Sequence, residues 1–261
     1  MQSTCLSLAQ LALAVILPSL VSANQIVRYE QGQAWDSGKK TVMYTESHWS
    51  AYEGNVLKDR TVVYRCADGT PFARKEISYS QSKLAPAFNF RDERFNYEEG
   101  LRWRDGKAQL WHSLNNRTEQ KALDVSADLV ADAGFDVFVK DRWQSLAQTG
   151  SQPLQFAVPS RLTSYSFNLK RTGSMPYRNT NAQNFALELG GWLSFIAPSI
   201  ELTYSNSSQR LLRFKGMSNI LNNAGEKPVQ ALIEFPLNDQ IVPEKEKRQA
   251  QAILLKSCQI S

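Results

Sequence analysis

The chain has 261 residues, of which 42% are hydrophobic and 21% are charged, with a formal net charge of +5. This apolar content can bury a sizeable core, and the charged residues keep the surface soluble. The basic residues are scattered and interleaved with acidic ones, as in 91–94, 102–107 and 244–248. A nucleic-acid binder usually gathers its basic residues on one face, so we expect no nucleic-acid partner.

Residues 1–23 have the pattern of an export signal. Residues 6–20 are mostly apolar and uncharged, and residues 21–23 supply the small side chains that signal peptidase accepts. The apolar run is too short to span a bilayer comfortably, although an uncleaved anchor is the alternative. We therefore expect a cleavable signal peptide over 1–23 and a periplasmic mature protein over 24–261. No Gly/Ser linker or repeat interrupts 24–261, so one β-rich domain is expected.

Alternating apolar and polar residues predict two β-hairpins. The first joins 61–66 to 71–79 through Asp68-Gly69, and the second joins 101–104 to 107–112 through Asp105-Gly106. An Asp-Gly between alternating runs indicates a tight turn in which both residues have positive φ. Further alternating runs are 154–158, 165–169, 185–189, 200–204, 210–215 and 229–235. About ten locally connected strands predict an antiparallel meander.

Two segments have helical patterns. In 132–148 the apolar residues recur at helical spacing, with Asp132 as an N-terminal cap and Gly150 just past the end. The tail 243–258 is a second candidate, with charges early and apolar residues late. The expected fold is mainly β: a strongly curved antiparallel sheet, as a half-barrel or barrel, with one embedded amphipathic helix and a C-terminal helix. Such a sheet leaves a concave apolar interior.

The stretch 189–198 is uncharged, apolar and aromatic. One interpretation is a buried strand or crossover that bends at two glycines. The other is a mobile flap hinged at Gly190-Gly191. Trp192, Leu193, Phe195 and Ile196 would then cover a ligand or contact a partner or membrane surface.

After removal of Cys5 with the signal, two cysteines remain, Cys66 and Cys258. An even pair in an oxidising compartment favours a disulfide, and two buried free thiols are the alternative. With two cysteines and two histidines, we expect no metal site and no cofactor.

The sequence contains no recognisable catalytic set. His48 lies near Glu46, and such a pair could orient a base, but no serine or cysteine occupies a nucleophile elbow. His112 closes an alternating strand and is expected to be structural or exposed. No phosphate-binding glycine loop, HExxH or CxxC is present, so we assign no catalytic residue.

The tracts 132–162 and 210–220 resemble uncharacterised exported proteins of Gram-negative bacteria. The wider layout, a signal followed by a strand meander with an embedded helix, is similar to half-barrels of the lipoprotein-localisation-factor type. This resemblance implies a fold that holds acyl chains or other apolar ligands, and it carries no catalytic motif.

The leading functional hypothesis is a non-catalytic periplasmic protein that binds an apolar or amphipathic ligand, a lipid included, in the concave sheet. Peripheral membrane contact is compatible with this function. A structural partner in an envelope complex and a hydrolase using His48 are the alternatives. The ligand, the pathway and the oligomeric state are not encoded in any pattern that the sequence shows.

Overall fold

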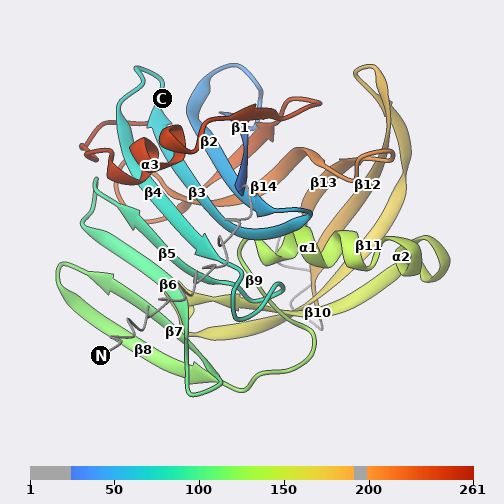
Figure 1. Cartoon of the computed structure of the whole chain (residues 1–261), viewed down its shortest axis with the longest axis horizontal. Coiled ribbons are helices and arrows are strands. Elements are labelled where there is room, and N and C mark those ends of the chain that lie inside the picture. Colours follow the sequence, from blue (N-terminus) through green and yellow to red (C-terminus); the bar gives the residue numbers. More distant parts are fainter. Residues whose placement is uncertain (1–24, 191–198) are drawn as a thin grey trace, which may run out of the picture.

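The computed structural model describes residues 25–190 and 199–261, and one large sheet dominates them (Figure 1). The described strands are β1 (Gln25–Trp35), β2 (Val42–Glu53), β3 (Val56–Cys66), β4 (Pro71–Ser78), β5 (Ala87–Asp92), β6 (Tyr97–Arg104), β7 (Lys107–Leu114), β8 (Arg117–Leu123), β9 (Leu129–Ala131), β10 (Ser151–Val158), β11 (Thr163–Tyr177), β12 (Thr180–Leu189), β13 (Ile200–Ser205), β14 (Leu211–Leu221), β15 (Pro228–Glu234) and β16 (Gln240–Val242). The helices are α1 (Gly134–Asp141), α2 (Trp143–Thr149), α3 (Glu244–Ala252) and the short 3-10 helix η1 (Pro159–Arg161).

Two antiparallel meanders build the sheet. The first runs from β1 to β8 and the second from β10 to β15, and they join where β1 pairs with β15. Strand β9 adds a parallel pair beside β10, and β16 pairs with β1. The far ends of the sheet approach each other, because η1 packs against β6 and β7, and β11 reaches β8. The expected mainly-β fold with a strongly curved antiparallel sheet is therefore confirmed.

Side chains fill most of the concave side of this sheet. Around Tyr64, the rings of Phe72 and Phe90 pack at centroid distances of 6.3 and 5.7 Å. A second cluster packs Phe138 and Leu146 from the two helices against the sheet. The described interior is thus a packed aromatic core rather than an open apolar trough.

The embedded helix is interrupted at one residue. Arg142 separates α1 from α2, although hydrogen bonds of helical spacing continue across it from Arg142 N to Phe138 O and from Leu146 N to Arg142 O. Gly150 ends α2 with φ 78°, as predicted. The predicted cap was wrong, because Asp132 places its side chain on the Lys75 ammonium group and on the backbone N–H of Ala133.

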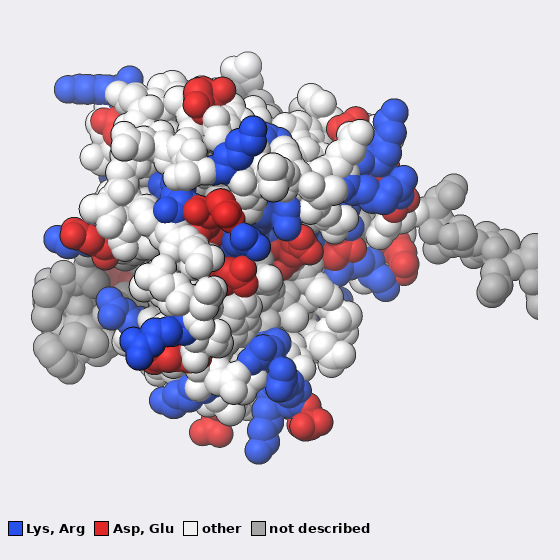
Figure 2. All heavy atoms as spheres, turned by 90° about the vertical axis from the view of Figure 1, so that its left-hand side faces the viewer, with Lys and Arg blue, Asp and Glu red and all other residues white. Residues whose placement is uncertain are grey.

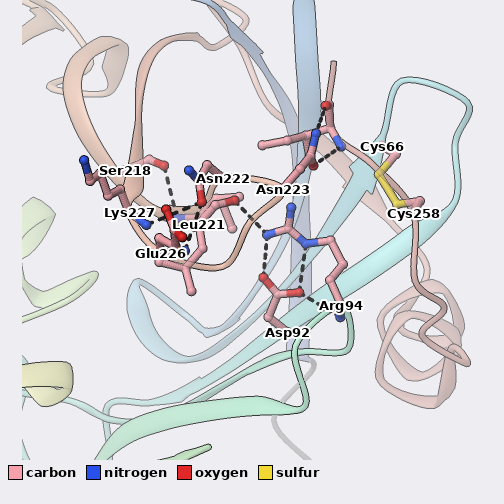
Figure 3. Close-up of polar contacts among 12 residues, drawn as sticks. Cys66, Asp92, Arg94, Ser218, Leu221, Asn222, Asn223, Glu226, Lys227 and Cys258 are labelled. Carbon is pink, nitrogen blue, oxygen red and sulfur yellow. Dashed lines mark hydrogen bonds and ion pairs between the residues drawn. A yellow bond between two sulfur atoms is a disulfide. The ribbon is translucent and has the colours of Figure 1, made fainter.

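The C-terminal helix is shorter than predicted. Helix α3 ends at Ala252 rather than near 258, and the chain then runs extended along the loop after β3, where Lys256 N donates to Pro71 O. The extended form lets Cys258 reach Cys66, and the two form a disulfide (Figure 3). Helix α3 covers the outer face of β1 to β3, where Ala250 packs against Trp49 and Val63.

A cluster of polar side chains holds this tail in place (Figure 3). Asn223, in the loop after β14, brackets Ile260, accepting from its N–H at 3.0 Å and donating to its C=O at 2.9 Å. Beside it, the Arg94 guanidinium pairs with the Asp92 carboxylate and donates to the Leu221 carbonyl at 3.1 Å. Most polar groups at this end of the sheet therefore have specific partners, although Arg94 Nη1 has none among the described residues.

Of the two predicted Asp-Gly turns, one has the expected geometry. Asp105 and Gly106 have φ values of 48° and 73°. In the other turn only Gly69 has positive φ, because Asp68 instead accepts a hydrogen bond from the Thr70 N–H in a longer loop. Both hairpins form as predicted.

Two sequence predictions concern residues outside the described parts of the chain. The predicted signal peptide covers 1–23, and the side chains of the predicted flap belong to 191–198. Among the described helices, none has the length and apolar character needed to cross a membrane.

Candidate functional site

A cavity of about 90 Å³ lies between α1, the β1 to β3 strands and the segments around β14 and β16. Its walls are mostly charged or polar, unlike the aromatic core beside it. The lining residues are Arg28, Glu30, His48, Ser50, Tyr52, Arg60, Asp136, Lys140, Arg210, Leu211, Phe235 and Asp239. We refer to it as the charged pocket. Figure 2 shows one face of the molecule, on which Lys and Arg side chains are interspersed with Asp and Glu.

Strand alternation carries three neighbouring strands into the pocket. Arg28 and Glu30 are two residues apart on β1, and His48 and Ser50 are two apart on β2, so each pair shares a face. The register places Arg28 opposite Ser50 and Ser50 opposite Arg60. Cross-strand partners lie side by side on one face, so these side chains meet on the concave side of the sheet.

The segment that links β15 to β16 forms a second wall. It leaves β1 after Glu234 and rejoins it at Gln240, which brings Phe235 and Asp239 to the pocket. Gly32 permits this approach, since a Cβ there would lie 2.7 Å from the Phe235 ring. Phe235 also stands edge-on to the His48 imidazole, with ring centroids 5.6 Å apart.

Helix α1 forms the third wall with Asp136 and Lys140. The helix begins at Gly134, which packs so closely on the 79–86 loop that a Cβ would overlap the Leu84 carbonyl oxygen. The buried ion pair between Lys75 and Asp132 fixes the chain just before the helix. The position of the Asp136 carboxylate is therefore set by close packing at the helix start.

Ion pairs neutralise most charges in the pocket. The Arg210 guanidinium contacts the Glu30 carboxylate and lies 2.8 Å from the Asp239 carboxylate. Arg28 reaches the same Asp239 carboxylate at 3.4 Å. On α1, Lys140 Nζ lies 2.8 Å from Asp136 Oδ2.

Arg60 differs from the other pocket cations. Its Nε donates to Ser50 Oγ at 2.9 Å, but among the described residues no carboxylate lies within ion-pair distance of it. Burial opposes its charge, yet nearby Tyr79 and Asp136 outweigh that cost and raise the pKa of the guanidinium. Arg60 thus keeps a full positive charge that no contacting acid in the described residues neutralises.

Several donors in the pocket have no hydrogen-bond partner within the described parts of the chain. They are the Arg210 Nε group and the N–H of the His48 imidazole, whose two ring nitrogens, one a donor and the other an acceptor in the neutral ring, are both buried without a partner. The acceptor Asp136 Oδ1 in the same pocket also has none among the described residues. Glu46 Oε1 lies 3.4 Å from His48 Nε2, which is too long for a good hydrogen bond. Buried polar groups are almost always satisfied in native proteins, so these donors call for water or a ligand group with acceptor oxygens.

One residue of this pocket was considered in the sequence analysis, as part of the hydrolase alternative. His48 lines the pocket beside Glu46, as the predicted pairing requires, and His112 lies on β7 and takes no part in the lining. In 25–190 and 199–261, no group of three or more His, Cys, Asp or Glu side chains is placed to hold a metal ion.

The arginines and acids of the pocket were missed. They lie far apart in the sequence, from Arg28 to Asp239, and the charged strand β1 was not recognised as a strand. The one available signal was the spacing of Arg28 and Glu30 two residues apart in an otherwise alternating segment, which places two charges on one face.

Comparisons with known proteins give little further information. No protein-family model matches the sequence, and no curated protein matches it. One similar solved structure is described as a beta-barrel-like protein of the domain of unknown function DUF1849 from Brucella abortus. It has a TM-score of 0.42 and 8% identity, and the match covers 84% of this chain and 98% of that one. A likeness at this TM-score carries no argument here.

Proposed function

We propose that this protein is a non-catalytic binding protein of the periplasm, and that it holds an amphipathic ligand, a lipid included. The ligand's polar end occupies the charged pocket, and its apolar end lies against the pocket mouth. One observation carries the proposal: the charged pocket and exposed apolar side chains share one face of the same strands.

The pocket itself accommodates a polar group and not an acyl chain. The cavity volume of about 90 Å³ is smaller than the roughly 150 Å³ of a cavity that admits a benzene ring. The charged lining would also make burial of a hydrocarbon unfavourable. The packed aromatic core supports the same assignment, because it leaves the apolar part of a ligand outside the sheet.

The mouth offers that apolar surface. Ile26 is two residues from Arg28 on β1, and Ile241 on β16 is the cross-strand partner of Arg28, so all three side chains share a face. Ile26 is 37% exposed and Ile241 is 71% exposed. Tyr52 completes the mouth, with the Arg28 guanidinium 5.6 Å from its ring centroid. Burying such side chains against a ligand is worth about 1.5–3 kcal/mol each when complete.

The disulfide and the predicted signal both support the periplasm as the compartment. A bridge between Cys66 and Cys258 belongs to an oxidising environment. The export pattern in 1–23 makes the periplasm the compartment of choice in a Gram-negative host.

The rival hydrolase has one observation in its favour, the proximity of His48 to Glu46. A nucleophile would need to lie within hydrogen-bond reach of the imidazole. Ser50 shares the pocket, but its Oγ accepts from Arg60 Nε, and no described hydroxyl is hydrogen-bonded to His48. Binding without turnover is therefore the better-supported function.

The test is native mass spectrometry and organic extraction of the full-length chain purified from its own envelope. We expect a bound amphiphile that Ile241→Asp depletes. The control is Leu254→Asp, at a residue that is 74% exposed in the C-terminal tail, which should retain the ligand. Protein that carries no amphiphile, and takes none up from extracted envelope lipid, would contradict the proposal. Ester turnover abolished by His48→Asn would favour the hydrolase, and a stoichiometric protein would favour an assembly role.

A further inference from the structure

We infer that the charged pocket recognises a phosphate-type oxyanion, held by Arg60 together with His48 and Arg210. The inference rests on the proposed function in taking the pocket as the binding site, and it adds the chemical class of the group that enters.

The first argument is charge. The pocket acids Glu30 and Asp239 already share Arg210, and Asp136 is paired with Lys140. The lining therefore holds four cationic side chains against three carboxylates, an excess of one positive charge. Arg60 is the cation that contacts a neutral hydroxyl and no carboxylate among the described residues, although Asp136 and Glu30 are near enough to raise its pKa. An anionic ligand would balance the excess charge of the partly buried lining.

The second argument is the number and kind of unsatisfied groups. The terminal nitrogens of Arg60 form no recorded hydrogen bond with the described residues, and neither do Arg210 Nε and the His48 ring nitrogens. These groups reach the pocket from β3, from the loop before β14 and from β2. Donors that converge from three directions suit a group with three or more acceptor oxygens, which a phosphate ester supplies and a carboxylate does not.

The third argument is preorganisation. Ser50 Oγ accepts from Arg60 Nε and so leaves the terminal nitrogens of the fork free for a ligand. The edge contact with Phe235 orients the His48 ring, and two carboxylates hold the Arg210 head in place. Donors whose orientation is fixed beforehand lose less entropy when an oxyanion binds.

The two histidines give a test on the unmodified protein. Proton NMR of the imidazoles should show the His48 signals shift on titration with inorganic phosphate or glycerol 3-phosphate, while those of His112 stay in place. Glycerol, which lacks the oxyanion, should move neither. Unchanged His48 signals at millimolar phosphate and phosphoester would overturn the inference.

Substitutions of Arg60 test whether this residue contacts the oxyanion. By titration calorimetry, Arg60→Gln should weaken phosphoester binding about 10- to 100-fold, the loss expected for charge-assisted hydrogen bonds. Arg60→Lys keeps the charge and loses the fork, so it should fall between Gln and wild type. Arg117→Gln, on the exposed strand β8, is the control and should bind as wild type does. Equal affinity for folded Arg60→Gln and wild type would overturn the assignment.

Two ligand sources are separated by comparing glycerol 3-phosphate with the short-chain lipid dihexanoylphosphatidylglycerol. Tighter binding of the lipid, lost in Arg60→Gln, identifies a lipid headgroup. Equal binding of both identifies a soluble phosphoester, in which case the oxyanion inference stands and the amphipathic ligand fails. An envelope amphiphile retained in full by Arg60→Gln would have the opposite meaning: the proposed function stands and the oxyanion inference fails.

Discussion

The buried ion pair between Asp92, at the end of β5, and Arg94 permits a quantitative prediction. Asp92 and Arg94 have side chains that are 1% and 2% exposed, and the guanidinium donates to both carboxylate oxygens, at 2.9 and 2.6 Å. The same guanidinium lies 4.3 Å from the Phe72 ring centroid and binds the Leu221 carbonyl. We consider the single substitutions Asp92→Asn and Arg94→Met and the double variant.

Each single substitution leaves one buried charge without its partner. That situation typically costs about 3–5 kcal/mol of the free energy of unfolding. In the double variant neither charge remains, and the main loss is the hydrogen bond to the Leu221 carbonyl, about 1–3 kcal/mol. The double variant should therefore be more stable than either single variant, with a coupling energy of about 3 kcal/mol or more.

The assay is equilibrium unfolding in urea with the disulfide intact, monitored by tryptophan fluorescence. The matched control is the neighbouring pair Arg91 and Glu93, whose side chains are 46% and 35% exposed. Breaking that pair should cost about 1 kcal/mol or less, because water screens exposed ions. Additive losses at Asp92 and Arg94, or a single-variant loss as small as that of the control, would refute the reasoning.

Three further predictions follow from other parts of the fold. Cys66→Ser with Cys258→Ser should lower the unfolding free energy by about 3–5 kcal/mol, measured by urea unfolding, because the bridge closes a loop with a sequence separation of 192. Gly134→Ala should cost about 1–3 kcal/mol and lower the melting temperature, since its Cβ would overlap the Leu84 carbonyl. Burial raises the pKa of Glu99, so the folded state holds this proton more tightly than the unfolded chain, and ionisation subtracts stability above the raised pKa. Glu99→Gln should therefore stabilise the protein at neutral pH and lose that advantage as the pH falls below the usual glutamate range; an advantage that does not depend on pH would contradict this.

Sequence patterns predicted the parts of the fold that local physics determines. Alternation and an Asp-Gly turn sufficed for the β6–β7 hairpin, and helical spacing with a terminal glycine sufficed for α1 and α2. Strand β1 was missed because its charged residues, Arg28 and Glu30, lie on the face that meets the concave side of the sheet, where an apolar residue is expected. Strand β8 was missed because most of its residues are polar and exposed. Whether such a segment joins the sheet depends on the strands that pair with it, and a local sequence pattern carries no information about those strands.

The candidate site was less predictable for a related reason. The Glu46–His48 pair could be found because its members are close in sequence. Arg60 and Arg210 are indistinguishable from surface arginines until the fold brings them under α1. That arrangement depends on the strand register, on the path of the segment that links β15 to β16, and on the close packing at Gly134. All three are tertiary properties.

The pairing of β1 with β15 imposes an order on folding. The chain is synthesised from its N-terminus, so the meander from β1 to β8 is available long before the strand that covers the open edge of β1. Trp35 cannot pair with Leu232, and Cys66 cannot bond to Cys258, until the C-terminal part of the chain has been synthesised. Contacts of such sequence separation slow folding, because a long loop must close before they contribute.

During that interval an unpaired strand edge is exposed, which is where chains aggregate or exchange strands. The two charged residues of β1, Arg28 and Glu30, make that edge a poor template for another chain. The side chains that line the charged pocket of the folded protein would thus also protect the incomplete sheet before its last strands are added.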